Sequence, residues 1–287
     1  MRERFRSNNI TPKKLTYISS INSILEEYSE QGYRLTLRQL YYQLVARDFI
    51  PNRVQEYSKL SSVLVDARMN GLTDWGMIED RIRKPHLLYW VRDIQDAIND
   101  TVRYYRLNRQ EGQKNCIEIW TEKDAVSNIL KRVSQYFHLR LMINRGYSSC
   151  SAMKEAFDRL RLSNRKTIIL YIGDHDPSGL DMIRDVDSRL AEFGLDNFEV
   201  IHVALTADQI REFSPPPNPA KITDPRSRWY ISEFGSESWE LDALKPGDLE
   251  RIVRNIAEEY IDLNLFESMV QKEKEDKEKL MELVKNI

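Results

Sequence analysis

Apolar residues in the first 70 positions recur at helical spacing in three stretches. Thr11-Pro12 can begin the first helix, with threonine as the N-cap and proline at the first helical position. A second helix is predicted over residues 37–50 and a third from about Val54 to Met69. A short extended stretch over residues 74–83 follows. Three short helices and a small extended element predict a winged-helix domain, although a plain helical bundle would have the same pattern.

The pattern changes after a polar stretch that ends near residue 114. Residues 85–110 predict a connecting helix, and beyond it strands and helices alternate strictly. The predicted strands cover residues 115–122, 139–146, 166–174 and 198–206, and the helices between them cover residues 124–137, 148–162 and 179–194. Such alternation predicts a mostly parallel sheet with helices on both faces.

We therefore expect an α/β protein made of three parts. Residues 1–84 would form the winged-helix domain, residues 85–114 the connector, and residues 115–287 a Rossmann-like parallel-sheet domain with a C-terminal helical extension. Within the last part, the Pro- and Ser-rich residues 214–238 predict an ordered loop. Residues 246–266 predict an amphipathic helix, and the charged residues 271–287 predict a solvated one.

Composition narrows the class of protein. Apolar residues make up 41% of the chain and charged residues 31%, which is typical of a globular protein. No run approaches the roughly 18 apolar residues of a membrane helix. Cys116 and Cys150 form no spaced metal-binding pair, and two cysteines in so long a chain indicate reduced thiols, so we expect a cytoplasmic or nucleoid-associated protein.

Charge is distributed unevenly along the chain. The net charge is −2, but residues 1–60 contain ten basic and six acidic residues, a surplus of +4. A basic N-terminal part permits a nucleic-acid-binding face there. A solvated surface without a ligand is equally compatible with the charge alone.

Three carboxylates are predicted at the carboxyl edge of the sheet. Asp174 and Asp176 come where one apolar strand ends, and positions i and i+2 of an extended segment point to the same side. Glu122 ends another predicted strand. Carboxylates that converge at this ligand-binding edge repel each other unless a hard cation such as Mg²⁺ neutralises them. The alternative is that both aspartates are turn and helix-cap residues.

These strand ends carry a resemblance to a known family. The motifs are Glu122-Lys123, Asn144-Arg145-Gly146-Tyr147 and Asp174-His175-Asp176-Pro177-Ser178-Gly179. Over roughly residues 115–205 they resemble the Toprim domain, more narrowly that of the A subunit of topoisomerase VI and its meiotic double-strand-break relatives. The resemblance implies a Mg²⁺ site at Glu122, Asp174 and Asp176. Residues 239–244 also resemble a segment of these proteins, but no role is assigned to Glu240.

An upstream motif extends the resemblance. Topoisomerase VI A subunits carry an Arg-x-x-Tyr-Tyr motif in a winged-helix domain, and its second tyrosine attacks DNA. Here residues 38–42 read Arg-Gln-Leu-Tyr-Tyr. Helical spacing places Tyr41 on the apolar face, whereas Arg38 and Tyr42, four apart, share a more polar face. A cation beside a phenol favours the phenolate, although a tyrosine pair can also be ordinary core.

We therefore expect a Mg²⁺-dependent enzyme that cleaves double-stranded DNA by tyrosine transesterification. Tyr42 would be the nucleophile, Arg38 would assist it, and a covalent 5′-phosphotyrosyl link would form. The resemblance implies a homodimer in which the tyrosine of one subunit meets the metal site of the other. The residues contain no Gly-x-x-x-x-Gly-Lys-Ser/Thr loop, so strand passage would need a separate ATPase B-type subunit.

Two alternatives remain open at the level of the sequence. A metal-dependent nuclease of the same architecture, as in plasmid-defence systems, would use water as the nucleophile and Tyr42 would be structural. A DNA-binding scaffold without cutting activity would not need the acidic residues. Covalent trapping on DNA distinguishes tyrosine transesterification from hydrolysis by a nuclease. A Mg²⁺-dependent cleavage assay distinguishes a DNA-cutting enzyme from a scaffold.

Overall fold

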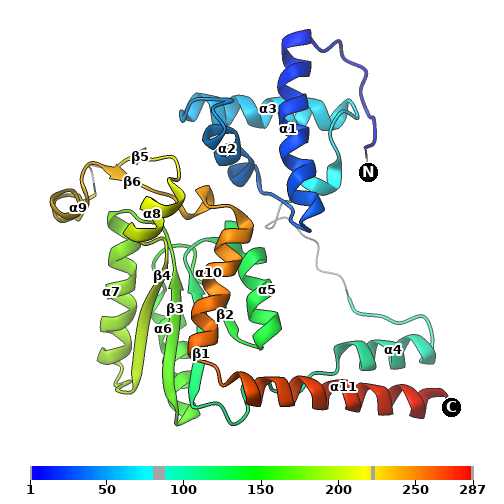
Figure 1. Ribbon diagram of the computed structural model, residues 1–287, viewed down its shortest axis with the longest axis vertical. Coiled ribbons are helices and arrows are strands. Elements are labelled where there is room, and N and C mark those ends of the chain that lie inside the picture. Colours follow the sequence, from blue (N-terminus) through cyan, green and yellow to red (C-terminus); the bar gives the residue numbers. More distant parts are fainter. Residues whose placement is uncertain (1, 80–87, 221–223, 286–287) are drawn as a thin grey trace.

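The protein has an α/β fold in which three N-terminal helices stand above a parallel sheet (Figure 1). The structure is a computed structural model that describes residues 2–79, 88–220 and 224–285. The N-terminal helices are α1 (Pro12–Glu30), α2 (Leu37–Ala46) and α3 (Val54–Met69). Their apolar faces form one buried cluster, so the three predicted helices are confirmed.

Helix α2 is shorter than the sequence predicts. Thr36 and Gln39 form a reciprocal capping box at its start. At its end Asp48 adopts a left-handed conformation with φ 56°, and the Phe49 amide donates to the Leu44 carbonyl at 3.0 Å. This bond closes the last turn and stops the helix at Ala46, four residues before the predicted end.

The extended element predicted over residues 74–83 is only partly within the described residues. Trp75–Met77 forms a single 3-10 turn, η1. Ile78 then pairs with Leu35 in one isolated parallel bridge, and residues 80–83 lie outside the described part. What the structure describes here is a helical unit closed by a bridge.

The connector contains a shorter helix than predicted. Helix α4 runs over Ile94–Tyr104, and the described residues 88–93 before it are not helical. Asp93 starts the helix by accepting a hydrogen bond from the Asp96 amide at 2.8 Å. The prediction of one helix over residues 85–110 is therefore wrong for residues 88–93 and 105–110, and residues 85–87 lie outside the described part.

The sheet has four strands in the order β2-β1-β3-β4, and every pair is parallel. The strands are β1 (Asn115–Thr121), β2 (Arg140–Ile143), β3 (Lys166–Ile172) and β4 (Phe198–Ala204). The helices that cover them are α5 (Ser127–Phe137), α6 (Cys150–Leu160), α7 (Pro177–Glu192) and α10 (Pro246–Glu259). The predicted parallel sheet with helices on both faces is confirmed.

Side chains alternate between the two faces of the sheet. Ile117 and Ile119 of β1 point into a core shared with α5 and α10. Trp120 of β1 and Tyr171 of β3 point into the opposite core, formed with α6 and α7. Both faces are buried, which explains why β3 reads as a nearly continuous apolar run.

The Pro- and Ser-rich stretch is more regular than the predicted loop. After α8 (Ala207–Phe213), it contains β5 (Asn218–Pro219), α9 (Ser227–Phe234) and β6 (Glu237–Ser238). Strands β5 and β6 pair antiparallel, and residues 221–223 lie outside the described part. The prediction of a loop without regular elements over residues 214–238 is therefore wrong.

The C-terminal helix α11 (Leu263–Lys285) lies along α4 (Figure 1). Glu273 on α11 is 3% exposed and accepts hydrogen bonds from the Leu107 amide and from Arg109, both at 3.1 Å. Burial opposes its charge, but these donors and Lys277 outweigh burial and lower the pKa of Glu273 to about 2. One buried carboxylate thus ties the connector to the C-terminal helix.

Among the described residues, none of the helices combines the length and the apolar character needed to span a bilayer.

Candidate functional site

Two of the three predicted carboxylates lie together at the carboxyl edge of the sheet. Glu122 directly follows β1, and its Oε1 accepts a hydrogen bond from the Asp174 amide at 2.9 Å, just beyond the paired strand β3. Asp174 Oδ1 in turn accepts from the Leu241 amide at 2.8 Å. Parallel pairing of β1 with β3 therefore joins residues that are 52 positions apart in the sequence.

Asp176 has a local role as well. Its Oδ1 accepts a hydrogen bond from the Gly179 amide at 2.6 Å and caps helix α7. Its charge nevertheless acts on Glu122 and contributes to raising the pKa of that carboxyl group. The helix-cap role considered from the sequence is therefore present, and the link of Asp176 to the other carboxylates is the effect of its charge on Glu122.

A lysine stands among the acidic residues. Lys123 Nζ lies 2.7 Å from Asp174 Oδ2, 2.9 Å from Glu240 Oε2 and 3.2 Å from Asp242 Oδ2. We call the six residues of this group the strand-end cluster: Glu122, Lys123, Asp174, Asp176, Glu240 and Asp242. Sequence reasoning assigned no role to Lys123, Glu240 or Asp242. The signals in the sequence were the Glu122-Lys123 motif and the resemblance of residues 239–244 to a family segment.

Three acidic members of the cluster, Glu122, Asp174 and Glu240, have perturbed pKa values. Burial raises the pKa of Asp174 to about 7. The charge of Lys123 opposes this rise, and the charge of Glu122 adds to it. Burial likewise raises the pKa of Glu122. For Glu240, burial is outweighed by Lys123 and Arg38, and its pKa falls to about 2. Perturbed pKa values of this kind are common at functional sites.

The donor set fits a hard cation in its chemistry. All the candidate ligands are carboxylate oxygens, which Mg²⁺ prefers. Asp242 Oδ1 is buried and accepts no hydrogen bond from the described residues. Across the described part of the chain, however, no three His, Cys, Asp or Glu side chains stand close enough together to hold a metal ion. The ammonium group of Lys123 lies among the carboxylates, so a metal ion would have to displace it.

Helix α2 faces the same cluster. Arg38 makes an ion pair with Glu240, and its Nε lies 3.7 Å from Asp242 Oδ2. These contacts join α2 to the short turn η4 (Leu241–Ala243). The predicted catalytic arginine and the acidic edge of the sheet are therefore in contact within one chain.

Tyr42 differs from the expectation in its exposure. It is 3% exposed and Tyr41 is 5% exposed, so Tyr42 is buried although helical spacing places it on the more polar face of the helix. The hydroxyl groups still point to different places. Tyr42 Oη accepts a hydrogen bond from Asn218 Nδ2 at 3.0 Å, whereas Tyr41 Oη donates to Asn52 Oδ1 at 2.9 Å. The reason is that β5 covers this face of α2, which no helical periodicity could reveal.

The expected effect of Arg38 on Tyr42 is also outweighed. Burial, followed by the charge of Glu240, raises the pKa of Tyr42 to about 12. Asn218 and Arg38 lower it only in part, because Arg38 is itself paired with Glu240. In this arrangement Tyr42 is a neutral, covered phenol. The phenolate that the sequence predicted needs a rearrangement of this contact.

Comparisons with known proteins add no family to this description. A scan against protein-family models gives no match for the chain, and a search of curated proteins gives none either.

Proposed function

We propose that this protein cleaves double-stranded DNA with Tyr42 as the nucleophile and Mg²⁺ bound at the strand-end cluster. In this proposal the N-terminal helices form a winged-helix domain and the parallel sheet is a Toprim domain, as the sequence resemblance implies. Glu122, Asp174 and Asp176 would hold the metal, and Glu240 or Asp242 would complete its oxygen ligands. When bound, Mg²⁺ would neutralise these carboxylates and polarise a phosphate oxygen.

One observation carries the proposal. Arg38 on the tyrosine helix is paired with Glu240, and Lys123 links Glu240 to Asp174 at the end of strand β3. The two motifs lie about 135 residues apart in the sequence. Their contact in the folded chain supports one composite site rather than two unrelated features.

The chemistry follows from the residues of the site. The Tyr42 oxygen would attack a backbone phosphorus, forming a bond to phosphorus while the bond to the 3′ oxygen breaks. The phenol would lose its proton to solvent and the leaving 3′ oxygen would take one up, so the exchange is proton-neutral. Arg38 could hold a non-bridging phosphate oxygen once it is released from Glu240.

Tyr42 must be uncovered before it can react. Its hydroxyl group is held by Asn218, and its helix is held by the Arg38–Glu240 pair. Phosphate groups of DNA would compete with Glu240 for Arg38, because a guanidinium group binds both kinds of anion in the same forked geometry. We infer that DNA itself loosens this contact and exposes the tyrosine.

A pair of matched variants tests the nucleophile. Tyr42→Phe should fold and bind DNA but form no covalent adduct, because the attacking oxygen is missing. Tyr41→Phe is the control, since it removes a neighbouring hydroxyl group and should keep the adduct. The assay incubates supercoiled DNA with protein and Mg²⁺, denatures with detergent, and detects protein-linked breaks. An adduct that survives in Tyr42→Phe would refute the assignment.

A hydrolytic nuclease is the second candidate, and the burial of Tyr42 favours it. Its hydroxyl group is covered and its pKa is raised to about 12. A nucleophilic tyrosine would have to overcome both obstacles, whereas a structural tyrosine would not. In that case Tyr42→Phe would still cut DNA in a Mg²⁺-dependent way, and no protein-linked break would form. Absence of cutting in every variant and in the wild type would instead support a scaffold.

The partners in this proposal are double-stranded DNA, a second copy of the chain and, for strand passage, a separate ATPase subunit. The sequence resemblance places the tyrosine beside the metal site of the partner subunit, whereas here Arg38 and Tyr42 lie beside the cluster of their own chain. Light scattering with and without DNA tests the dimer. A protein that stays monomeric in both conditions would cut, if at all, with a site from one chain.

A further inference from the structure

A second cavity lies at the opposite edge of the sheet from the strand-end cluster. It has a volume of about 330 Å³ and is formed where β1 and β2 begin, between the connector and the turn η3 (Arg161–Ser163). Glu118, the lining residue nearest to that cluster along β1, comes four residues before Glu122, so about 13 Å of strand separates the two sites at about 3.3 Å per residue. The cavity is therefore independent of the proposed cleavage site.

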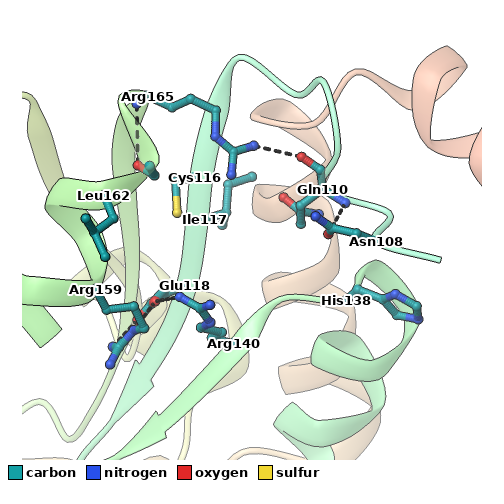
Figure 2. Close-up of a pocket in the computed structure, with 11 residues that line it drawn as sticks. Asn108, Gln110, Cys116, Ile117, Glu118, His138, Arg140, Arg159, Leu162 and Arg165 are labelled. Carbon is teal, nitrogen blue, oxygen red and sulfur yellow. Dashed lines mark hydrogen bonds and ion pairs between the residues drawn. The ribbon is translucent and has the colours of Figure 1, made fainter. Parts of the chain in front are cut away.

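Guanidinium groups dominate the charge of this cavity. Arg140, Arg159 and Arg165 line it, and Glu118 is its one lining carboxylate, so three positive charges minus one negative charge leave a surplus of +2 (Figure 2). Glu118 is fully buried and already accepts two hydrogen bonds from Arg159, both at 2.8 Å. Arg140 lies 3.6 Å from Glu118 and is 63% exposed. Its donors are largely available to an anion.

Two further polar side chains, Gln110 and His138, line the same cavity. Gln110 is 8% exposed; its Nε2 donates to the Phe137 carbonyl at 2.8 Å, while its buried Oε1 accepts from none of the described residues. The Nδ1 of His138 lies 2.8 Å from the Leu107 carbonyl and must donate to it, which leaves Nε2 as an acceptor in the neutral ring. A buried acceptor without a donor is costly, so it points to a ligand with N–H or O–H groups.

The rest of the lining is partly apolar. Ile117 and Cys116 belong to β1, and Leu162 on η3 is 79% exposed at the cavity mouth. In the view of Figure 2, Cys116 and Ile117 are drawn between the Glu118–arginine group and the pair Asn108 and Gln110. The cavity thus offers anion donors, an apolar surface and acceptors to a single ligand.

We propose that this cavity binds a phosphate-bearing small molecule of mononucleotide size. Its phosphate would meet Arg140 and the remaining donors of Arg159 and Arg165, because arginine recognises phosphate in a forked geometry. Its hydroxyl or amino groups would donate to Gln110 and His138. A volume of about 330 Å³ is at the lower end of ligand pockets and far larger than one phosphate ion needs.

Isothermal titration of the full chain with AMP and dAMP tests the proposal. EDTA is included so that no metal ion can carry a nucleotide to the strand-end cluster. Inorganic phosphate and adenosine are titrated separately, to distinguish phosphate recognition from recognition of the nucleoside. We expect AMP or dAMP to bind, and phosphate alone and adenosine alone to bind at least tenfold more weakly, because each makes only part of the contacts.

Three variants locate the ligand. Arg140→Ala should weaken nucleotide binding roughly tenfold to a hundredfold, as expected for loss of a charge-assisted hydrogen bond. Arg161→Ala removes the same charge from a nearby exposed residue that pairs with Asp158 and does not line the cavity, so it should leave affinity unchanged. Leu162→Trp should block the mouth of the cavity without changing any charge or buried contact.

Three results would overturn the proposal. The first is the absence of binding by either nucleotide at millimolar concentration. The second is nucleotide binding that Arg140→Ala and Leu162→Trp leave unchanged, which would place the ligand elsewhere. The third is phosphate binding as tight as that of AMP, which would reduce the cavity to a site for small anions. DNA cleavage enters none of these measurements, so the outcome does not depend on the function proposed above.

Discussion

Removal of Lys123 should destabilise the protein, and Mg²⁺ should restore the stability. Lys123 is 14% exposed and is the ammonium group within 3.2 Å of Asp174, Glu240 and Asp242. Lys123→Met keeps the length and apolar stem of the side chain but leaves these carboxylates without that charge. Breaking a buried ion pair by removing one partner costs about 3–5 kcal/mol.

This loss of stability can be measured as a decrease in the melting temperature. For a chain of this size, 1 kcal/mol corresponds to roughly 2–4 °C, so the variant should melt about 6–20 °C below the wild type without metal. Millimolar Mg²⁺ should raise the melting temperature of the variant more than that of the wild type, because in the wild type the cation must displace the lysine. When the Mg²⁺ concentration is a hundred times the dissociation constant of the site, binding stabilises the folded protein by about 2.7 kcal/mol.

The assay is thermal unfolding followed by circular dichroism, with EDTA or with Mg²⁺. Lys131→Met is the matched control, since Lys131 is an exposed lysine on α5. Two results would refute the reasoning. A melting temperature within about 2 °C of the wild type in EDTA would mean that Lys123 does not balance the cluster. An equal effect of Mg²⁺ on both proteins would mean that the cation binds elsewhere.

Three further predictions follow from other parts of the structure. Gly179→Ala should destabilise the protein by about 1–3 kcal/mol and weaken Mg²⁺ binding, because a Cβ at this position would overlap the Asp174 carbonyl oxygen. Equal Mg²⁺ titrations of variant and wild type would contradict this prediction. Glu273→Gln should cost about 1–3 kcal/mol near neutral pH in urea unfolding. Folding lowers the pKa of Glu273 to about 2, so the stability that its charge contributes is fully present above the pKa of the unfolded chain. This stability is lost as the pH falls toward 2, where the free energies of unfolding of variant and wild type should converge. A difference between them that stays constant with pH would exclude this cause. DNA binding, measured by fluorescence anisotropy, should weaken steeply with salt, and a flat response would argue against a basic N-terminal DNA face.

The sequence by itself determined the α/β class and the order of most elements. Strand and helix periods differ, and β3, which is buried on both faces, is a nearly continuous apolar run. Residues 115–206 were therefore readable as a parallel sheet. Glu122 and Asp174 were placed together for the same reason. Parallel strands bring their carboxyl ends to one edge, whatever the details of side-chain packing.

Local boundaries were less accessible to sequence reasoning. The end of α2 depends on the left-handed residue Asp48. Residues 88–93 are not helical, and Asp93, which caps α4, is one of several acidic residues that could start the helix. Helix α9 lies in a Pro- and Ser-rich stretch whose composition favours a loop. At the first two boundaries the conformation or cap of a single residue decides where the helix ends or begins, which a periodicity pattern does not record.

Only the tertiary structure decided the environment of Tyr42 and Lys123. Helical spacing correctly separated the directions of Tyr41 and Tyr42, but the cover over Tyr42 comes from Asn218, which is 176 residues away in the chain. Lys123 meets Glu240 and Asp242, which are 117 and 119 residues away in the chain. Burial and charge at a site depend on which distant segments are brought together, and therefore the proton affinities of these groups are properties of the fold rather than of the motif.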